Sequence, residues 1–199
     1  MKHMSEKVPI KPIEKLHRRG YLPHFDAAGF TQFITIRLAG SLPATIFESL
    51  KFKLKTKQLN EIEYHWQIEK SLDLGTGPTF LKDTRIAGLV ARAILKFDGE
   101  RYELHSWVVM PNHAHIMFTP INSFTVSSIM HSIKGFTAGE ANKILGRSGR
   151  FWSPDYFDRF IRNRKQFMRA KKYIDDNPVK AGLCETPSEW PWGSAGWRG

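Results

Sequence analysis

The spacing of hydrophobic residues changes along the chain, and the changes predict strands and helices in a definite order. Residues 31–38 (TQFITIRL) alternate, which gives a strand with two distinct faces. One face carries Gln32, Ile34, Ile36 and Leu38, and the other carries Phe33, Thr35 and Arg37. The runs 101–110 and 113–119 are separated by Pro111-Asn112, two residue types that favour turns, and therefore predict a hairpin.

Most of the remaining chain has helical spacing. Pro43 opens a long charged stretch that predicts one helix reaching about residue 72. Residues 84–96, 126–145 and 164–176 predict three more helices, and residues 156–161 predict a short strand.

Local signals mark two of the helix ends. Asp83 is a suitable N-cap for the helix at 84–96, because its carboxylate can accept from the first free N–H groups. Asn177-Pro178 is expected to end the last helix, because the residue before a proline is biased away from helical backbone.

The predicted order is strand, helix, strand, strand, helix, strand and a last helix. This order indicates an α+β, ferredoxin-like antiparallel sheet with helices on one face and an added C-terminal helix. The helix at 84–96 is taken as an insertion. The expected organisation is a basic, irregular N-terminal segment (1–30), one domain (31–185) and a tryptophan-rich tail (186–199) that packs on the domain surface.

The charge of the chain favours a polyanionic partner. Thirty Lys and Arg against nineteen Asp and Glu give a net charge of +11, and basic side chains displace counterions from phosphates. No run of 18 apolar residues predicts a membrane helix, and the N-terminus lacks the apolar region of a secretory signal. With Cys184 as the one cysteine, an internal disulfide is excluded. We expect a cytoplasmic protein with no membrane partner.

His113-Ala114-His115 is the sharpest chemical signal. On a strand, residues i and i+2 share a face, so both imidazoles can reach one divalent metal. Imidazole suits Mn, Zn or Fe better than Mg, which is not excluded. Two histidines on a half-buried sheet face with no metal are the alternative.

Tyr173 is the second candidate. It lies at the edge of the apolar stripe of the helix 164–176, and Asn177, four residues on, shares its face. A phenol can act as a covalent nucleophile when a metal stabilises charge on the phosphate that it attacks. Asn177 could offer its carbonyl oxygen as a third ligand. The alternative is that Tyr173 is a core residue whose hydroxyl contacts water, and that Asn177-Pro178 only ends the helix.

Basic and aromatic residues alternate around this helix, an arrangement that suits single-stranded nucleic acid, although a solvated helix face over a Phe-rich core is equally possible. The candidate DNA-binding residues are Arg162, Arg164, Lys165, Arg169, Lys172 and Lys180.

Four stretches of the chain resemble one family. They are RGYLPHFDAAGFTQFITIRLAGSLP, HSWVVMPNHAHIMFTP, FWSPDYFDRFIRN and YIDDNPVKAGLCETPSEWPWGSA. These resemble the REP-associated tyrosine transposases, which belong to the insertion-sequence-200-like single-tyrosine HUH transposases. Two positions depart from the family pattern: Ala114 stands where a bulky apolar residue is usual, and Gly193 replaces a serine of the tail motif.

The resemblance implies both a reaction and a set of roles. His113 and His115 correspond to the HUH metal ligands, Tyr173 to the nucleophile and Asn177 to a third ligand, with Mg²⁺ or Mn²⁺ as the cofactor. Members cut and rejoin single-stranded DNA at hairpin-bearing palindromic repeats through a 5′-phosphotyrosine, as monomers or homodimers. DNA recognition by the N-terminal segment extends the DNA-binding candidates to Arg18 and Arg19, and a DNA enzyme of this kind would be associated with the nucleoid.

Two other functions fit parts of the pattern. A non-catalytic protein that binds single-stranded nucleic acid on a ferredoxin-like scaffold would use the charge and the aromatic residues alone. A metal-dependent phosphohydrolase would need more carboxylate ligands than the motif supplies.

Overall fold

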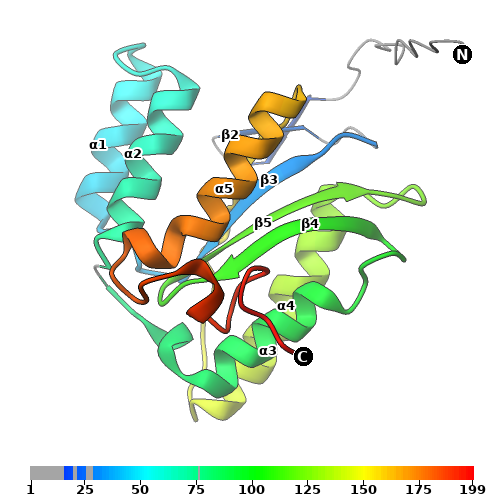
Figure 1. Cartoon of the computed structure of the whole chain (residues 1–199). Helices are drawn as coiled ribbons and strands as arrows, with labels where there is room; N and C mark the ends of the chain where they lie inside the picture. The colour runs from blue at the N-terminus through cyan, green and yellow to red at the C-terminus, as the bar shows by residue number, and fades with distance from the viewer. Residues whose placement is uncertain (1–15, 20–21, 26–28, 76) are drawn as a thin grey trace, which may run out of the picture.

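The centre of the protein is a four-stranded antiparallel sheet (Figure 1). The computed structural model describes residues 16–19, 22–25, 29–75 and 77–199. The strands are β3 (Gln32–Arg37), β4 (Tyr102–Val109), β5 (His113–Pro120) and β6 (Phe157–Phe160), in the spatial order β4-β5-β3-β6. The first and third strands in the sequence are therefore central, which confirms the predicted ferredoxin-like α+β fold.

The register of the central strands positions the histidine pair. In the antiparallel pairing of β3 with β5, Thr35 lies opposite His115 and Arg37 lies opposite His113. Neighbours on both sides hydrogen-bond to β5, so its side chains point only to the two faces of the sheet. His113 and His115 consequently share one face, as the sequence predicted.

Helices α3 (Thr84–Leu95) and α4 (Val126–Ile144) cover the other face. Together with the sheet they enclose the largest apolar core, which includes Ile36, Ile86 and Ile133. Asp83 caps α3 as predicted. The prediction that this helix is an insertion is wrong, because α3 supplies half of the helical layer over the sheet.

The insertion is a helical hairpin formed by α1 (Ala44–Lys55) and α2 (Glu61–Asp73), where the sequence predicted one long helix. The chain reverses between them, where Lys57 takes a left-handed backbone (φ 58°) and Asn60 forms a capping box that starts α2. A separate small core holds the hairpin together and includes Leu50, Ile68 and, from β6, Phe157.

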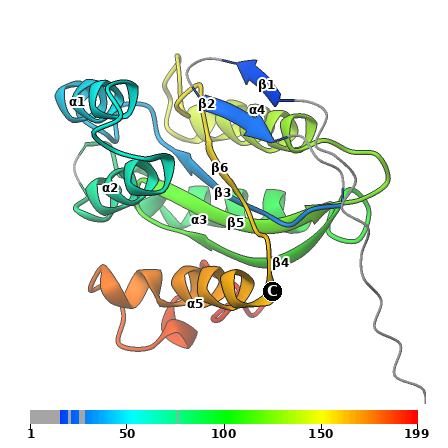
Figure 2. The same ribbon diagram turned by 90° about the horizontal axis from the view of Figure 1, so that it is seen from above.

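Helix α5 (Arg164–Lys180) lies on the face of the sheet opposite α4 (Figure 2). Ile174 packs there in an apolar cluster with Phe33 and Met117. The prediction that the helix ends at Asn177-Pro178 is wrong. Pro178 lacks an N–H and so removes one backbone hydrogen bond, which is a small loss this close to the end of the helix. The next turn still forms, because the N–H of Ala181 donates to the carbonyl of Asn177.

Further elements lie at the two ends of the chain. In the tail, Trp192 accepts a hydrogen bond from the backbone N–H of Val109, and Ser194 donates to the carbonyl of Trp107, so the tail covers the free edge of β4. Residues 1–30 were expected to be irregular, yet the described part contains a two-stranded ribbon, β1 (Leu16–Arg19) with β2 (Leu22–Phe25). The rest of that expectation lies outside the described residues. No helix in the described part of the chain is long and apolar enough to cross a membrane.

The packing of Ile174 yields a stability prediction. Its side chain is fully buried, so Ile174→Ala should lower the free energy of unfolding by about 2–5 kcal/mol through lost burial and the cavity left behind. Met168→Ala on the same helix removes a side chain that is 54% exposed, and should change the free energy of unfolding by less than about 0.5 kcal/mol. Urea unfolding measures both, and equal losses would contradict the placement of α5 on the sheet.

Candidate active site

The two imidazoles of the motif meet in the layer between the sheet and α5. The Nε2 atoms of His113 and His115 lie 3.1 Å apart, and both side chains are almost fully buried. Burial lowers the pKa of His113 to about 3. Burial, and then the neighbouring charges of His113 and Arg159, also lower the pKa of His115 well below its ordinary value. Both rings are therefore neutral near pH 7, which is the form that binds metal.

Hydrogen bonds at the opposite nitrogens orient the two rings. The Asn112 amide donates to the carbonyl of Leu72 (3.0 Å), which turns its Oδ1 toward Nδ1 of His113 at 2.7 Å. Because that oxygen can only accept, the proton of His113 sits on Nδ1 and the Nε2 lone pair is available as a ligand. The Thr35 hydroxyl lies 2.9 Å from Nδ1 of His115 and fixes the orientation of the second ring, although a hydroxyl that both donates and accepts does not select its tautomer.

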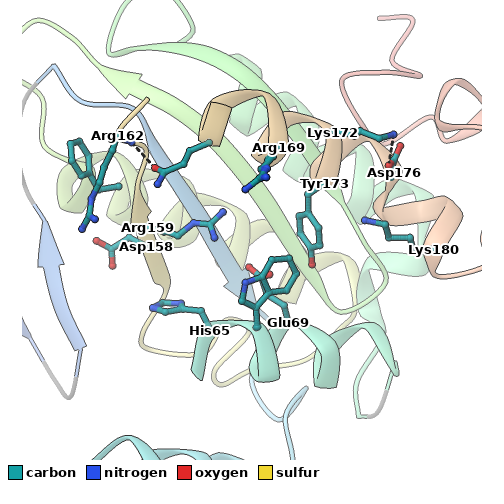
Figure 3. Close-up of a pocket in the computed structure, with 13 residues that line it drawn as sticks. His65, Glu69, Asp158, Arg159, Arg162, Arg169, Lys172, Tyr173, Asp176 and Lys180 are labelled. Carbon is teal, nitrogen blue, oxygen red and sulfur yellow. Dashed lines mark hydrogen bonds and ion pairs between the residues drawn. The ribbon is translucent and has the colours of Figure 1, made fainter. Parts of the chain in front are cut away.

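Helix α5 brings Tyr173 next to the histidine pair. The centroid of its ring lies 5.4 Å from that of His115 and 6.0 Å from that of Phe33. Figure 3 shows the ring reaching from α5 towards Glu69 on α2. The sequence-predicted nucleophile and predicted metal ligands thus come together from elements about 60 residues apart in the chain.

The surroundings keep the phenol of Tyr173 protonated. Burial raises its pKa far above the ordinary value, and the nearby carboxyl groups of Glu69 and Asp73 raise it further. Burial also raises the pKa of Glu69 to about 7 and that of Asp73 to about 6. Near neutral pH, Glu69 is therefore protonated in part of the molecules and ionised in the rest. It lies beside the Tyr173 hydroxyl, which would have to lose a proton to act as a nucleophile.

Several buried polar atoms at this point lack a hydrogen bond of regular geometry. They are the Tyr173 hydroxyl, one oxygen of Asp73 and both amide atoms of Asn177. Asn177 is 1% exposed and lies one helical turn beyond Tyr173. A buried amide whose hydrogen bonds are poorly formed costs free energy, so a group that binds here would satisfy it better.

A divalent metal fits this arrangement. Two nitrogens bound to one ion at about 2.1 Å and at a right angle would be about 3.0 Å apart, close to the observed spacing of the two Nε2 atoms. Among the described residues no three His, Cys, Asp or Glu side chains converge as ligands. The resemblance assigns the third ligand to Asn177, whose amide oxygen could take that position. The nearest carboxylate is Asp73, whose Oδ1 lies 3.8 Å from Nε2 of His113.

An open cavity of about 720 Å³ lies in front of Tyr173, between α2, β6 and α5 (Figure 3). Four of the predicted DNA-binding residues line it: Arg162, Arg169, Lys172 and Lys180. Arg164 and Lys165 are exposed in the first turn of α5, outside the lining. Arg18 and Arg19 belong to β1, for which the structure describes only the backbone.

Sequence reasoning missed the residues that α2 contributes, namely Trp66, Glu69 and Asp73, and the role of Asn112. Trp66, Glu69 and Asp73 are spaced three and four residues apart, which places them on one face of α2. That spacing was visible in the sequence, but nothing in it indicated that this face meets α5.

Three comparisons with known proteins bear on the chain. Residues 84–177 match the family model described as "Transposase IS200 like". A REP-associated tyrosine transposase of Escherichia coli (strain K12) is 34% identical over 106 residues, which are 52% of this chain and 61% of that relative's length. The solved "Structure of the REP associates tyrosine transposase bound to a REP hairpin" has a TM-score of 0.56 at 23% identity, covering 91% of this chain and 82% of that one.

These similarities agree with one another and with the geometry. The solved structure supports the fold, and the curated relative confirms the resemblance to REP-associated tyrosine transposases. The family match begins at α3 and contains both histidines, Tyr173 and Asn177, whereas the α1–α2 hairpin lies before it. Residues 84–177 of this chain are therefore similar to the IS200-like transposases, and the match stops short of the α1–α2 hairpin.

Proposed function

We propose that the protein is a metal-dependent transposase that cuts and rejoins single-stranded DNA through a covalent bond between Tyr173 and a 5′-phosphate. The observation that carries the proposal is the contact of the Tyr173 ring with His115, inside a segment of a transposase family. This contact brings a nucleophile to within reach of a phosphate held at the histidine pair.

The histidine pair and Asn177 would hold Mg²⁺ or Mn²⁺, through the two Nε2 atoms and the amide oxygen. A bound ion supplies Lewis acidity, which stabilises negative charge on the oxygens of the scissile phosphate. Asn112 and Thr35 keep both Nε2 atoms aimed at the same point.

Tyr173 provides the attacking oxygen. In the cleavage step its Oη forms a bond to phosphorus as the bond to the 3′-oxygen breaks, giving a 5′-phosphotyrosine and a free 3′-hydroxyl. The phenol proton passes to Glu69, whose pKa of about 7 allows it to accept that proton and then to donate it to the departing 3′-oxygen. Attack by a 3′-hydroxyl on the phosphotyrosine reverses the step and rejoins a strand.

Hairpin-bearing DNA is the substrate that we propose. The solved relative is described as bound to a REP hairpin, and the cavity beside Tyr173 presents the basic side chains that such a substrate requires. Binding to chromosomal DNA would place the protein at the nucleoid.

Cleavage can be tested with a covalent-adduct assay. A labelled hairpin oligonucleotide with single-stranded flanks, taken from palindromic repeats of the source genome, is incubated with Mn²⁺ and run on a denaturing gel. The wild type should give a protein–DNA adduct, which EDTA should abolish. Tyr173→Phe should give none, because it lacks the oxygen that bonds to phosphorus.

Tyr156→Phe is the matched control, because Tyr156 lines a different groove beside α4 and should keep wild-type adduct yield. A native gel shift without any adduct would indicate a DNA-binding protein with no catalysis. Cleavage that persists in Tyr173→Phe would indicate a hydrolase that uses water.

The metal site can be tested without measuring activity. Asn112→Ala removes the acceptor that fixes the proton of His113, and should weaken Mn²⁺ binding by about 10–100-fold in isothermal titration calorimetry. Asn142→Ala alters an asparagine that bonds to the Gly149 carbonyl and should leave the affinity unchanged. If the wild type binds no Mn²⁺, or if Asn112→Ala binds it equally well, the assigned ligands are wrong.

A further inference from the structure

Trp66 is a large aromatic residue that the hairpin core does not use. Its side chain is 50% exposed and lies outside the apolar cluster that joins α1 to α2. Its ring instead meets that of Tyr173 edge to face, with the centroids 5.7 Å apart and the planes at 84°. The indole of Trp66 is thus half-exposed and lies beside a candidate nucleophile. In this position it can contact a ligand.

The cavity in front of Trp66 has the dimensions of a ligand pocket. Its volume of about 720 Å³ falls within the usual range for bound small molecules and cofactors, roughly 300–1,000 Å³. Trp66 and Tyr173 lie in its wall, and Phe160 of β6 adds a third aromatic side chain. The cavity can therefore admit a flat aromatic group from solvent to a position adjoining the Tyr173 ring.

The charges around the cavity favour an anionic ligand. Arg159 of β6, Arg169 of α5 and Arg162 in the segment between them line it, across the cavity from α2 (Figure 3). Aromatic faces that stack bases, next to guanidinium groups that bind phosphates, are the combination found in proteins that bind single strands. A base-paired stretch would not fit, because each of its bases is already covered by its neighbours.

We propose that this cavity receives one unpaired nucleobase of the DNA substrate, within two nucleotides of the scissile phosphate, and that the base stacks on Trp66. The position relative to the scissile phosphate rests on the proposed function, whereas the stacking itself does not. Trp66 belongs to the α1–α2 hairpin, outside the segment matched by the family model. The hairpin would thus supply a DNA contact from outside the segment that carries the histidine pair and Tyr173.

Binding is the first test and needs no cleavage. Fluorescence anisotropy with a labelled eight-residue oligothymidine in EDTA should show that Trp66→Ala binds about tenfold more weakly than the wild type, within the range for loss of one stacked base. Trp66→Phe keeps an aromatic face and should recover most of the affinity. Phe52→Ala is the matched control: it removes an aromatic side chain, 61% exposed, from the other helix of the hairpin and should bind as the wild type does.

The second test locates the stacked base. In the hairpin oligonucleotide of the adduct assay, a single abasic site is moved step by step through the flank around the cleavage position. Wild-type affinity, measured with EDTA present, should fall about tenfold at one position within two nucleotides of the cut. Trp66→Ala should lose nothing further at that position, because the stacking partner is already missing.

The outcomes separate the two proposals. The nucleobase pocket is refuted if Trp66→Ala binds oligothymidine as tightly as the wild type. It is also refuted if an abasic site at the same position weakens DNA binding by Trp66→Ala as much as it weakens binding by the wild type. Both conclusions hold whatever the adduct assay shows. If oligothymidine binding depends on Trp66 but the wild type forms no adduct, the transposase mechanism fails and stacking on Trp66 stands.

Discussion

The burial of two neutral imidazoles on a central strand is the constraint on which the site depends. β5 has a partner strand on each side, so His113 and His115 can project only from a face of the sheet, and α5 covers that face. Desolvation there disfavours the charged imidazolium and keeps both Nε2 atoms able to bind metal. A histidine pair on an exposed edge strand would have neither the fixed orientation nor the lowered pKa.

The same constraint explains why the last helix must run through Pro178. To serve as the proposed third ligand, Asn177 must keep the helical register that it shares with Tyr173, one turn earlier. A helix that ended before the proline would release Asn177 into a turn. The buried Pro178 side chain gives this last turn an apolar contact of its own, which offsets the missing hydrogen bond.

The sequence predicted the parts of this architecture that depend on local spacing. Alternation along 31–38 and the single residue between the two histidines assigned faces correctly, because the period of a strand holds wherever the strand lies. The reversal at Lys57 was missed, because a lysine with left-handed backbone carries no local signal, unlike a glycine. The role of α3 was missed because it depends on contacts with α4, which lies about 40 residues further along the chain.

The candidate site shows the same division between local and distant information. His113, His115, Tyr173 and Asn177 could be chosen from short motifs, but Glu69 and Asp73 belong to the site only because α2 lies next to α5, where Trp66 contacts Tyr173. One chain of hydrogen bonds joins this inserted hairpin to the metal ligands: His113 donates to Asn112, and Asn112 donates to the carbonyl of Leu72 at the end of α2. Because the last acceptor is a backbone carbonyl, side chains on the outer face of the hairpin can change without disturbing His113. The hairpin can therefore vary in the side chains that it presents to the cavity beside Tyr173, while its far end continues to orient the histidine that would hold the metal.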